Sequence, residues 1–357
     1  MARIALENLR HSYMSNPSSD ADYALQQIDL EWLDGGAYAL LGPSGCGKST
    51  LLNIISGLLT PTQGRVLFDD QDVTDEPPAA RNIAQVFQFP VIYDTMTVYD
   101  NLAFPLRNRG VAKAQIDNRV REIAEMIDMT DMLKRRAANL TPDNKQKISM
   151  GRGLVRDDVN VIMFDEPLTV IDPHLKWKLR SKLRELHERI NLTMIYVTHD
   201  QTEALTFADQ VVVMDEGIVV QIGTPVELFE RPKHTFVGHF IGSPGMNLLP
   251  CSVRDGQAFF NETHVPVEGG QTAAVGSRLE IGVRPEFVSF APEGLPVDVI
   301  KVADAGRHRI VETRAGETSI KLFVDDGASI PDGSAHLAFD PNRTRVYADG
   351  WLAGEGR

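Results

Sequence analysis

Residues 37–52 read Ala-Tyr-Ala-Leu-Leu-Gly-Pro-Ser-Gly-Cys-Gly-Lys-Ser-Thr-Leu-Leu, an apolar run that leads through a glycine-rich loop into a helical pattern. The loop fits G-x-x-x-x-G-K-[ST], which binds phosphate when a strand precedes it and a helix follows it. Glycines let backbone N–H groups converge on a phosphate, the lysine adds a positive charge, and the serine hydroxyl is a ligand for Mg²⁺. A glycine-rich turn without a ligand is the alternative, and the flanking strand and helix argue against it. The predicted nucleotide-binding residues are Gly42, Pro43, Ser44, Gly45, Cys46, Gly47, Lys48, Ser49 and Thr50.

A second stretch places two carboxylates at the end of a buried strand. Residues 161–166 read Val-Ile-Met-Phe-Asp-Glu, so Asp165 and Glu166 follow four apolar residues. At the carboxyl end of such a strand, Asp165 is expected to hold Mg²⁺ through water, and Glu166 to orient the attacking water at the γ-phosphate. Acidic residues that close a strand are often only part of a turn. Together with the phosphate loop, they predict a nucleotide-hydrolysing site.

The fold class predicted for the first two thirds of the chain is α/β. Short apolar runs at Leu40–Leu41, 161–164, 194–197 and 211–214 alternate with helical patterns. The strand signal disappears over about residues 97–156, which predicts a helical insertion. Further on, short valine-rich segments are separated by Asp-Gly, Gly-Gly and Pro-Asp-Gly turns, which predicts a small all-β barrel or sandwich. We therefore expect a nucleotide-binding domain over 1–235 and a β-rich domain over 236–357.

Composition narrows the class of protein. The chain has 357 residues and a formal net charge of −13, which disfavours binding to phosphate backbones, so nucleic acid is not expected as a partner. The two cysteines, Cys46 and Cys251, are far apart and predict no disulfide framework, which favours a reducing compartment. Neither a membrane-spanning run nor a signal-peptide core is expected from the sequence. A role at a membrane therefore requires a partner.

The order of these motifs resembles that of the ATP-binding-cassette family, specifically the importer ATPases of the maltose and glycerol-3-phosphate type. The resemblance implies that Gln88 is the glutamine that senses Mg²⁺ and the permease. It implies that Asp172 is the D-loop aspartate and that His199 is the switch histidine at the γ-phosphate. Tyr13 resembles the aromatic residue that stacks on adenine, with Tyr23 as the alternative. The implied catalytic set is Glu166, His199, Gln88 and Asp172, and the implied Mg²⁺ set is Ser49, Gln88 and Asp165.

The resemblance also extends into the second domain. Segments 223–228, 240–244 and 282–286 are similar to those that lead into and through the family's C-terminal regulatory domain. This similarity implies an OB-like fold for the β-rich domain. It leaves open whether that domain binds a regulator.

One element departs from the family pattern. Where the family has Leu-Ser-Gly-Gly-Gln, this chain has Leu140, Thr141, Pro142, Asp143 and Asn144. Thr141 still suits an N-cap, but Pro142 has no N–H to donate, and Asp143 brings a carboxylate toward a γ-phosphate from the opposite subunit. This degenerate signature predicts that the chain pairs with a second, unlike ATPase subunit whose signature is intact. The alternative is a homodimer in which Asn144 or Lys145 compensates.

The function expected from motifs and resemblance is that of an ATP- and Mg²⁺-dependent ATPase that energises import of a carbohydrate or polyol, with glycerol, glycerol phosphate or a sugar as the solute. The expected partners are transmembrane permease subunits, a second ATPase and, indirectly, an extracytoplasmic solute-binding protein. The expected location is peripheral, on the cytoplasmic face of the inner membrane. The alternatives are a regulatory ATP-binding module with little turnover and a non-transport cassette ATPase.

Overall fold

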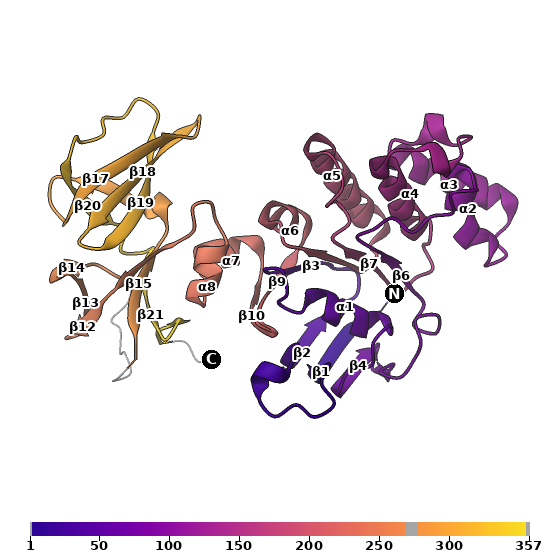
Figure 1. The fold of residues 1–357 in the computed structure, drawn as a ribbon, viewed down its shortest axis with the longest axis horizontal. Helices are drawn as coiled ribbons and strands as arrows, with labels where there is room; N and C mark the ends of the chain where they lie inside the picture. The colour runs from indigo at the N-terminus through magenta and orange to yellow at the C-terminus, as the bar shows by residue number, and fades with distance from the viewer. Residues whose placement is uncertain (1, 269–276, 355–357) are drawn as a thin grey trace. The chain divides into compact units, whose positions relative to one another are not determined.

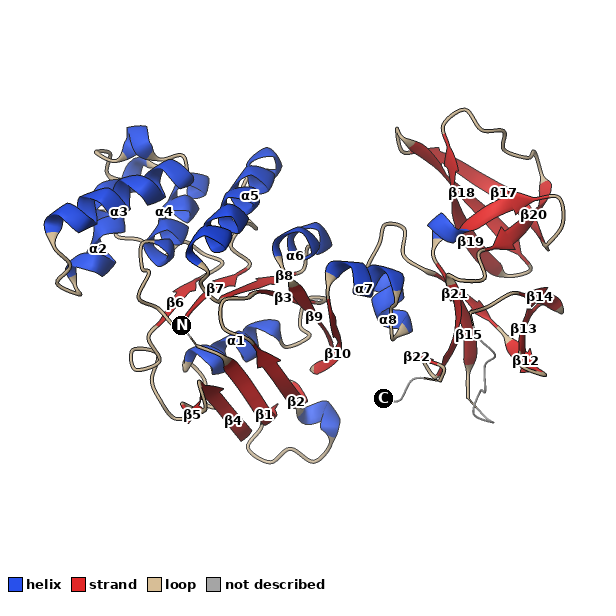
Figure 2. Ribbon diagram, turned by 180° about the vertical axis from the view of Figure 1, so that it is seen from behind, coloured by secondary structure: helices blue, strands red, loops and turns tan. Residues whose placement is uncertain are grey.

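The chain folds into two units, residues 1–225 and 226–357. The computed structural model describes residues 2–268 and 277–354. The first unit contains two sheets and most of the helices, and the second unit is built mainly from antiparallel strands (Figures 1 and 2). The two parts of the α/β and all-β prediction are therefore confirmed.

A six-stranded sheet carries the predicted phosphate loop and both predicted carboxylates. All neighbouring strands in it are parallel except β10 and β9, which pair antiparallel. The four buried apolar runs predicted as strands form β3, β7, β8 and β9 of this sheet. Its strand order is β10 (Ile218–Gly223), β9 (Gln210–Asp215), β3 (Ala37–Leu41), β8 (Met194–Thr198), β7 (Val161–Asp165) and β6 (Ile83–Val86).

A second, antiparallel sheet lies across helix α1 (Lys48–Ser56) from the six-stranded sheet (Figures 1 and 2). The apolar side chains of α1 at residues 51, 52, 54 and 55 are fully buried in one core with residues of both sheets. Burial of each such side chain stabilises the fold by about 1.5–3 kcal/mol, so α1 is held firmly at the end of the phosphate loop. The strands of the second sheet, in order, are β2 (Leu25–Trp32), β1 (Ile4–His11), β4 (Gln63–Phe68) and β5 (Gln71–Asp72), and a 3₁₀ turn, η1, spans Asp20–Asp22.

The predicted insertion over 97–156 consists of helices, and the remaining helices follow the strands of the six-stranded sheet. In Figures 1 and 2, α4 and α5 lie on the face of that sheet opposite to α1. The apolar residues of α5 at 179, 183 and 186 are 2% exposed, as the amphipathic pattern predicts. These helices are α2 (Val98–Arg107), α3 (Lys113–Met126), η2 (Thr130–Met132), η3 (Ala137–Asn139), α4 (Pro142–Leu154), α5 (Pro173–Ile190) and α6 (Gln201–Phe207).

The second unit begins with two short helices, α7 (Pro225–Glu230) and α8 (Thr235–Phe240). The buried side chain of Arg284 holds them to the strands, since Nε donates to the carbonyl of Phe229 and Nη1 to that of Ile241, both at 2.5 Å. Burial lowers the pKa of this guanidinium to about 10. Tyr347 adds a hydrogen bond from its hydroxyl to the carbonyl of Pro232 at 2.9 Å. The structure thus divides the chain earlier than the sequence prediction of 235/236, because partners distant in sequence anchor α7 and α8.

The described strands of the second unit form three antiparallel sheets around one apolar core. In sheet order they are β11 (Asn247–Pro250), β15 (Leu279–Val283), β21 (Thr344–Ala348) and β22 (Trp351–Leu352); β12 (Ser252–Arg254), β13 (Gln257–Phe260) and β14 (Thr263–Val265); and β16 (Val288–Ala291), β20 (Ser334–Phe339), β17 (Leu295–Asp304), β18 (His308–Ala315) and β19 (Thr318–Asp325), with the 3₁₀ turn η4 at Pro285–Phe287. Among the helices described, none is long and apolar enough to cross a membrane.

Candidate functional site

The predicted phosphate loop connects β3 to α1. Gly47 is the N-cap of α1 and has a left-handed backbone with φ +100°. A Cβ atom there would lie 2.7 Å from the carbonyl oxygen of Ala24, so the position accepts only glycine without a shift of the backbone. The nine-residue α1 therefore starts directly at the loop, with its first N–H groups and positive dipole end available to an anion.

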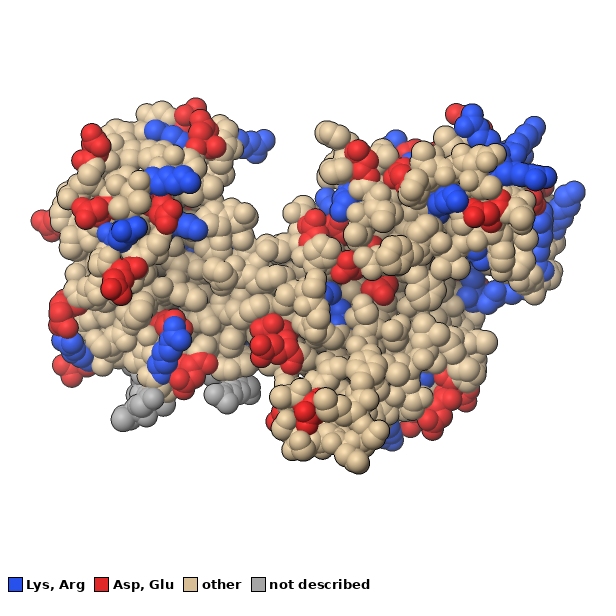
Figure 3. Space-filling model, viewed as in Figure 1, with Lys and Arg blue, Asp and Glu red and all other residues tan. Residues whose placement is uncertain are grey.

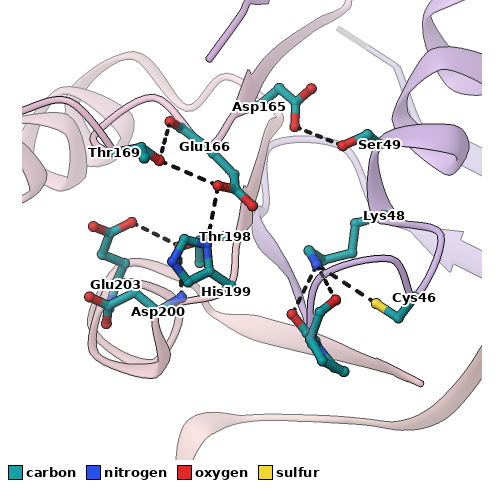
Figure 4. A network of polar contacts seen from close by, with 12 residues as sticks. Cys46, Lys48, Ser49, Asp165, Glu166, Thr169, Thr198, His199, Asp200 and Glu203 are labelled. Atoms are coloured by element: carbon teal, nitrogen blue, oxygen red, sulfur yellow. Dashed lines mark hydrogen bonds and ion pairs between the residues drawn. The ribbon is translucent and has the colours of Figure 1, made fainter. Parts of the chain in front are cut away.

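Lys48 is folded across this loop and is 4% exposed. Its Nζ atom donates to the carbonyl of Gly42 at 2.9 Å and to that of Pro43 at 2.8 Å. It also lies 3.7 Å from Sγ of Cys46, a buried thiol whose pKa is raised chiefly by burial (Figure 4). The ammonium group is thus held inside the loop that the sequence predicts to bind phosphate.

Asp165 ends β7 and faces the start of α1. Its Oδ1 atom accepts a hydrogen bond from Oγ of Ser49 at 3.3 Å, which brings together two of the three predicted Mg²⁺ ligands (Figure 4). Burial raises the pKa of Asp165, the hydrogen bond from Ser49 lowers it, and the negative charge of Glu166 raises it further. Among the described residues, no three His, Cys, Asp or Glu side chains form a group that could hold a metal ion. A hydroxyl and a single carboxylate fit Mg²⁺ that arrives with phosphate oxygens as its other ligands.

Glu166 has a left-handed backbone with φ 45°, an uncommon conformation for a residue with a side chain. Its N–H donates to the carbonyl of Val197 at 3.0 Å. The hydroxyl of Thr169 donates to the Glu166 carbonyl at 3.0 Å and contacts the carboxylate Oε2 at 3.3 Å. Strained backbone that is held by several contacts is typical of functional sites, and here it sets the direction of the carboxylate.

His199 follows β8, the strand next to β7. Because the two strands are parallel with Asp165 opposite Val197, the residues after each strand meet at the same edge. Nδ1 of His199 lies 3.1 Å from Oε2 of Glu166, and the imidazole is 53% exposed (Figure 4). The two residues proposed to act at the γ-phosphate are thus in contact.

The altered signature lies at the N-terminus of α4. As expected, Thr141 is the N-cap, its hydroxyl accepting from the N–H of Asn144 at 3.4 Å, and Pro142 is the first helical residue. Oδ2 of Asp143 lies 3.9 Å from Nζ of the buried Lys147, one helical turn away, and Oδ1 of Asp143 is buried with no hydrogen-bond partner among the residues that the structure describes. The Asp143 charge is therefore partly neutralised within the chain, which the sequence interpretation did not include.

Gln146 connects α4 to two other motifs. This glutamine is fully buried, and its Nε2 donates to the carbonyls of Phe87 at 3.1 Å and Pro167 at 3.0 Å. Phe87 precedes Gln88, and Pro167 follows Glu166 in the chain. The signature helix, the segment of Gln88 and the strand end of Glu166 therefore meet at one side chain.

Two further predicted site residues, Asp172 and Tyr13, contact residues at the N-terminal ends of helices. Asp172 is the N-cap of α5, and its side chain accepts from the N–H of His174 at 2.9 Å. Tyr13 is 68% exposed, and its hydroxyl lies 3.0 Å from Oγ1 of Thr50 in α1. The ring of Tyr23, in contrast, is covered by the guanidinium of Arg10 at 3.9 Å.

Sequence reasoning missed a group of polar residues behind His199. The buried carboxylate of Glu203 contacts the hydroxyls of Tyr196 at 3.1 Å and Thr198 at 2.9 Å. A signal was present, since Asp200 and Glu203 have the spacing of an N-cap and the third helical residue. The pattern alone did not reveal which strand it contacts.

Comparison with known proteins places these features in a family. Residues 25–169 match the family model described as ABC transporter, and residues 242–288 match the MalK OB fold domain. The sn-glycerol-3-phosphate import ATP-binding protein UgpC of Yersinia pestis is 42% identical over 347 residues, which are 96% of each chain. The protein of that name from Escherichia coli (strain K12) is 40% identical over 302 residues, which are 83% of this chain and 85% of the relative.

Solved structures agree with this assignment for the first unit. The structure of cbiO1 from Clostridium perfringens, part of the ABC transporter complex cbiONQ, covers 64% of this chain and 90% of its own, with a TM-score of 0.57 and 28% identity. The ADP conformation of MJ1267, an ATP-binding cassette of an ABC transporter, covers 65% of this chain and 96% of its own, with a TM-score of 0.54 and 25% identity.

Proposed function

The chain belongs to the ATPase subunits of ABC importers that carry a MalK-type OB domain, and from this membership we propose that its solute is a glycerol-type polyol or its phosphate. It binds ATP and works as an ATPase coupled to import, with transmembrane permease subunits as partners. The name of the relatives supports glycerol phosphate as the solute class. The solute itself contacts the permease and a solute-binding protein in this proposal, so the ATPase sequence supports only the class.

The observation that carries the ATPase mechanism is the meeting of Lys48, Asp165, Glu166 and His199 along one edge of the six-stranded sheet. In the proposal, phosphate oxygens replace the two loop carbonyls at Lys48, and Ser49 and Asp165 would hold Mg²⁺, whose charge would offset that of the phosphates. Glu166 then accepts a proton from the attacking water, and His199 stabilises the γ-phosphate. Gln88 is proposed to report the state of this site to the permease.

Tyr13 is the proposed adenine platform. Its ring is exposed and is tied to α1 through Thr50, whereas one face of the Tyr23 ring is already occupied by Arg10. An exposed aromatic ring beside the phosphate loop is suited to stacking on a base. The exposure of Tyr13 therefore favours it over Tyr23.

The proposed docking site of the permease is a groove of about 300 Å³ between the end of β6 and helices α2 and α4. It is lined by Gln85, whose amide oxygen and nitrogen are buried without a partner among the described residues. Phe89, Val91 and Tyr93, at and beside the groove, are 71%, 55% and 41% exposed. Exposed apolar side chains and an unsatisfied buried amide both suit a segment of another protein that supplies apolar contacts and backbone hydrogen bonds.

The rim of this groove is basic. Arg109, Arg152 and the largely buried Arg156 line it, although Arg109 and Arg156 each pair with Asp158, at 3.1 and 3.3 Å. Figure 3 shows Lys and Arg side chains concentrated over the end of the molecule formed by α2 and α3. The proposed permease segment therefore carries carboxylates beside its apolar residues.

A second, unlike ATPase with an intact signature is the proposed partner cassette. The loss of one donor to transition-state charge costs about 2.7–4 kcal/mol, and Pro142 lacks the N–H. The contact of Asp143 with Lys147 reduces the repulsion expected between the Asp143 carboxylate and a γ-phosphate. The N–H that Pro142 lacks is therefore the main support for a pair of unlike ATPase subunits.

Transport by the reconstituted importer tests these proposals together. We expect ATP-driven uptake of glycerol or sn-glycerol-3-phosphate and little uptake of maltose, and uptake of maltose alone would contradict the proposed class. Subunit composition is measured on the same complex by native mass spectrometry. Full transport-coupled turnover from a complex with two copies of this chain and no other ATPase would contradict the unlike pair.

A further inference from the structure

We propose that Glu203 is a positioning residue that sets the place of His199 through the hydroxyl of Thr198 and the N–H of Asp200, the residues on either side of the histidine. This inference rests on the role of His199 in the proposed function. It concerns three side chains behind the histidine, those of Thr198, Asp200 and Glu203, which we call the histidine clasp (Figure 4).

The clasp is a closed ring of hydrogen bonds. Oγ1 of Thr198 donates to Oε2 of Glu203 at 2.9 Å and accepts from the N–H of Asp200 at 3.0 Å. Oδ1 of Asp200 accepts from the N–H of Glu203 at 3.1 Å, which completes the ring. His199 lies between Thr198 and Asp200, so both of its neighbours are held by the same helix terminus.

The ring is an extended form of a capping box. In the usual box, the carboxylate at the third helical position accepts the backbone N–H of the N-cap residue directly. Here the hydroxyl of Thr198 accepts a hydrogen bond from the N–H of Asp200, the N-cap of α6. The same hydroxyl donates a hydrogen bond to the carboxylate of Glu203. The consequence is that the end of β8 is bonded to the start of α6 across the histidine.

Glu203 is unusual as an ordinary helix residue because its carboxylate is buried, with 3% of the residue exposed. A buried carboxylate is costly unless it is paired and hydrogen-bonded. Oε2 also accepts from the hydroxyl of Tyr196 at 3.1 Å, and Oε1 lies 3.4 Å from Nζ of Lys176. These contacts give both carboxylate oxygens partners and hold the group in one place.

Lys176 brings a second motif to the clasp. Its backbone N–H donates to the carbonyl of Asp172 at 3.0 Å in the first turn of α5, and its ammonium reaches Glu203. The helix that starts at the proposed D-loop aspartate and the threonine that precedes the proposed switch histidine therefore contact one carboxylate.

His199 needs such support because its own side chain is half exposed. Its imidazole contacts Glu166 at 3.1 Å, but 53% of it faces solvent, so core packing restrains the ring only in part. The backbone position then decides where the ring lies, and a misplacement of about 1 Å at a catalytic group can cost about 100-fold in rate.

The test compares the removal of two hydroxyls that bind the same carboxylate. Thr198→Val breaks the ring, whereas the matched control Tyr196→Phe removes a hydrogen bond to Glu203 and leaves the ring intact. We expect Thr198→Val in the assembled transporter to lower kcat for ATP by about 10- to 100-fold with KM unchanged. We expect Tyr196→Phe to keep kcat and Thr198→Ser, which retains the hydroxyl, to restore it.

Two measurements separate positioning from stability. Melting temperatures of the three variants show whether the folds differ, and Thr198→Ala replaces Thr198→Val if the valine variant is insoluble. In a His199→Ala background, Thr198→Val should lower the residual kcat no further, because the clasp acts through the histidine.

Three results would overturn the inference: equal loss of kcat in Thr198→Val and Tyr196→Phe, a normal kcat in Thr198→Val, or a full additional loss in the His199→Ala background. Near-normal turnover of His199→Ala itself would instead count against the proposed role of His199. The failure of the clasp and the failure of the mechanism are thus distinguishable.

Discussion

Nδ1 of His199 lies 3.1 Å from Oε2 of Glu166, although the two residues are 33 positions apart in the sequence. They meet because β7 and β8 are adjacent and parallel, and each residue follows the carboxyl end of its strand. The Glu166 carboxylate therefore has the imidazole of a residue on the neighbouring strand end as its partner. The first prediction therefore concerns the carboxylate of Glu166.

Glu166→Gln is expected to lower ATP turnover by about 10²–10⁴, because the amide keeps the shape but cannot accept a proton from water. ATP affinity should stay close to that of the unmodified protein, since the phosphate loop is untouched. Single-turnover hydrolysis and equilibrium nucleotide binding in the assembled complex measure the two effects. The matched control is Glu216→Gln, a glutamate with the same φ of 45° whose side chain has no role in the proposed mechanism. Near-normal turnover in the Glu166 variant would remove this residue from the mechanism.

Asp165→Asn is expected to raise the melting temperature of the nucleotide-free protein near pH 7. Burial raises the pKa of Asp165 above its ordinary value of 3.8, so the folded state binds this proton more tightly than the unfolded state does. Stability is therefore lost as the pH rises through that shifted pKa. The asparagine variant does not lose this stability, because its side chain does not ionise. The gain should shrink as the pH is lowered toward 4, while Mg²⁺-ATP binding weakens at neutral pH.

Asp22→Asn is a control in which the melting temperature near pH 7 is expected to change in the opposite direction. Hydrogen bonds from the backbone of Ser18 and Ser19 lower the pKa of Asp22, so its contribution to stability is present at neutral pH and lost in acid. Its asparagine variant should melt earlier near pH 7. A melting temperature that moves in the same direction for both variants would contradict the assigned burial effect at Asp165.

Tyr13→Ala is expected to weaken ATP binding about 5- to 150-fold, corresponding to about 1–3 kcal/mol for base stacking. Binding of inorganic triphosphate should change little, because it has no base. Tyr23→Ala serves as the control, since Arg10 covers its ring at 3.9 Å. Calorimetric titration with both ligands checks the assignment. A larger loss of ATP affinity in Tyr23→Ala than in Tyr13→Ala would show that Tyr23 stacks on adenine instead.

A chain that stops after residue 225 is expected to fold better than one that stops after Gly242. The longer version keeps α7 and α8 but loses Arg284, which binds their carbonyls, and exposes Leu228, Val237 and Ile241, all fully buried in the whole protein. Each newly exposed aliphatic side chain costs about 1.5–3 kcal/mol. Solubility and melting temperature compare the two versions, and equal behaviour would contradict the boundary at 225.

Much of the first unit could be predicted because its signals are local. A buried apolar run, a glycine-rich loop and a helix-forming pattern follow one another over residues 37–56, so neighbouring residues specify each element. The strands that end at Asp165 and Thr198 were equally visible as apolar runs. Even the contact between Asp143 and Lys147 was accessible in principle, because residues four apart lie on one helix face.

The boundary between the units was harder to predict for the opposite reason. Pro and Gly residues near 231–245 mark turns, but turns occur within a domain as well as between domains. What joins α7 and α8 to the second unit is Arg284, more than 40 residues further along the chain. No local pattern reports a hydrogen bond over that distance.

By itself, the sequence determined the phosphate loop, the acidic end of β7, the helical insertion and the altered signature, because each depends on residues that are close along the chain. Only the tertiary structure decided that Glu166 meets His199, that Gln146 joins three motifs, and that the carboxylate of Glu203 meets the hydroxyl of Thr198 beside the histidine. These contacts depend on which strands are neighbours. Strand order follows from the packing of the whole sheet against α1 and the insertion helices, and a linear pattern does not specify it.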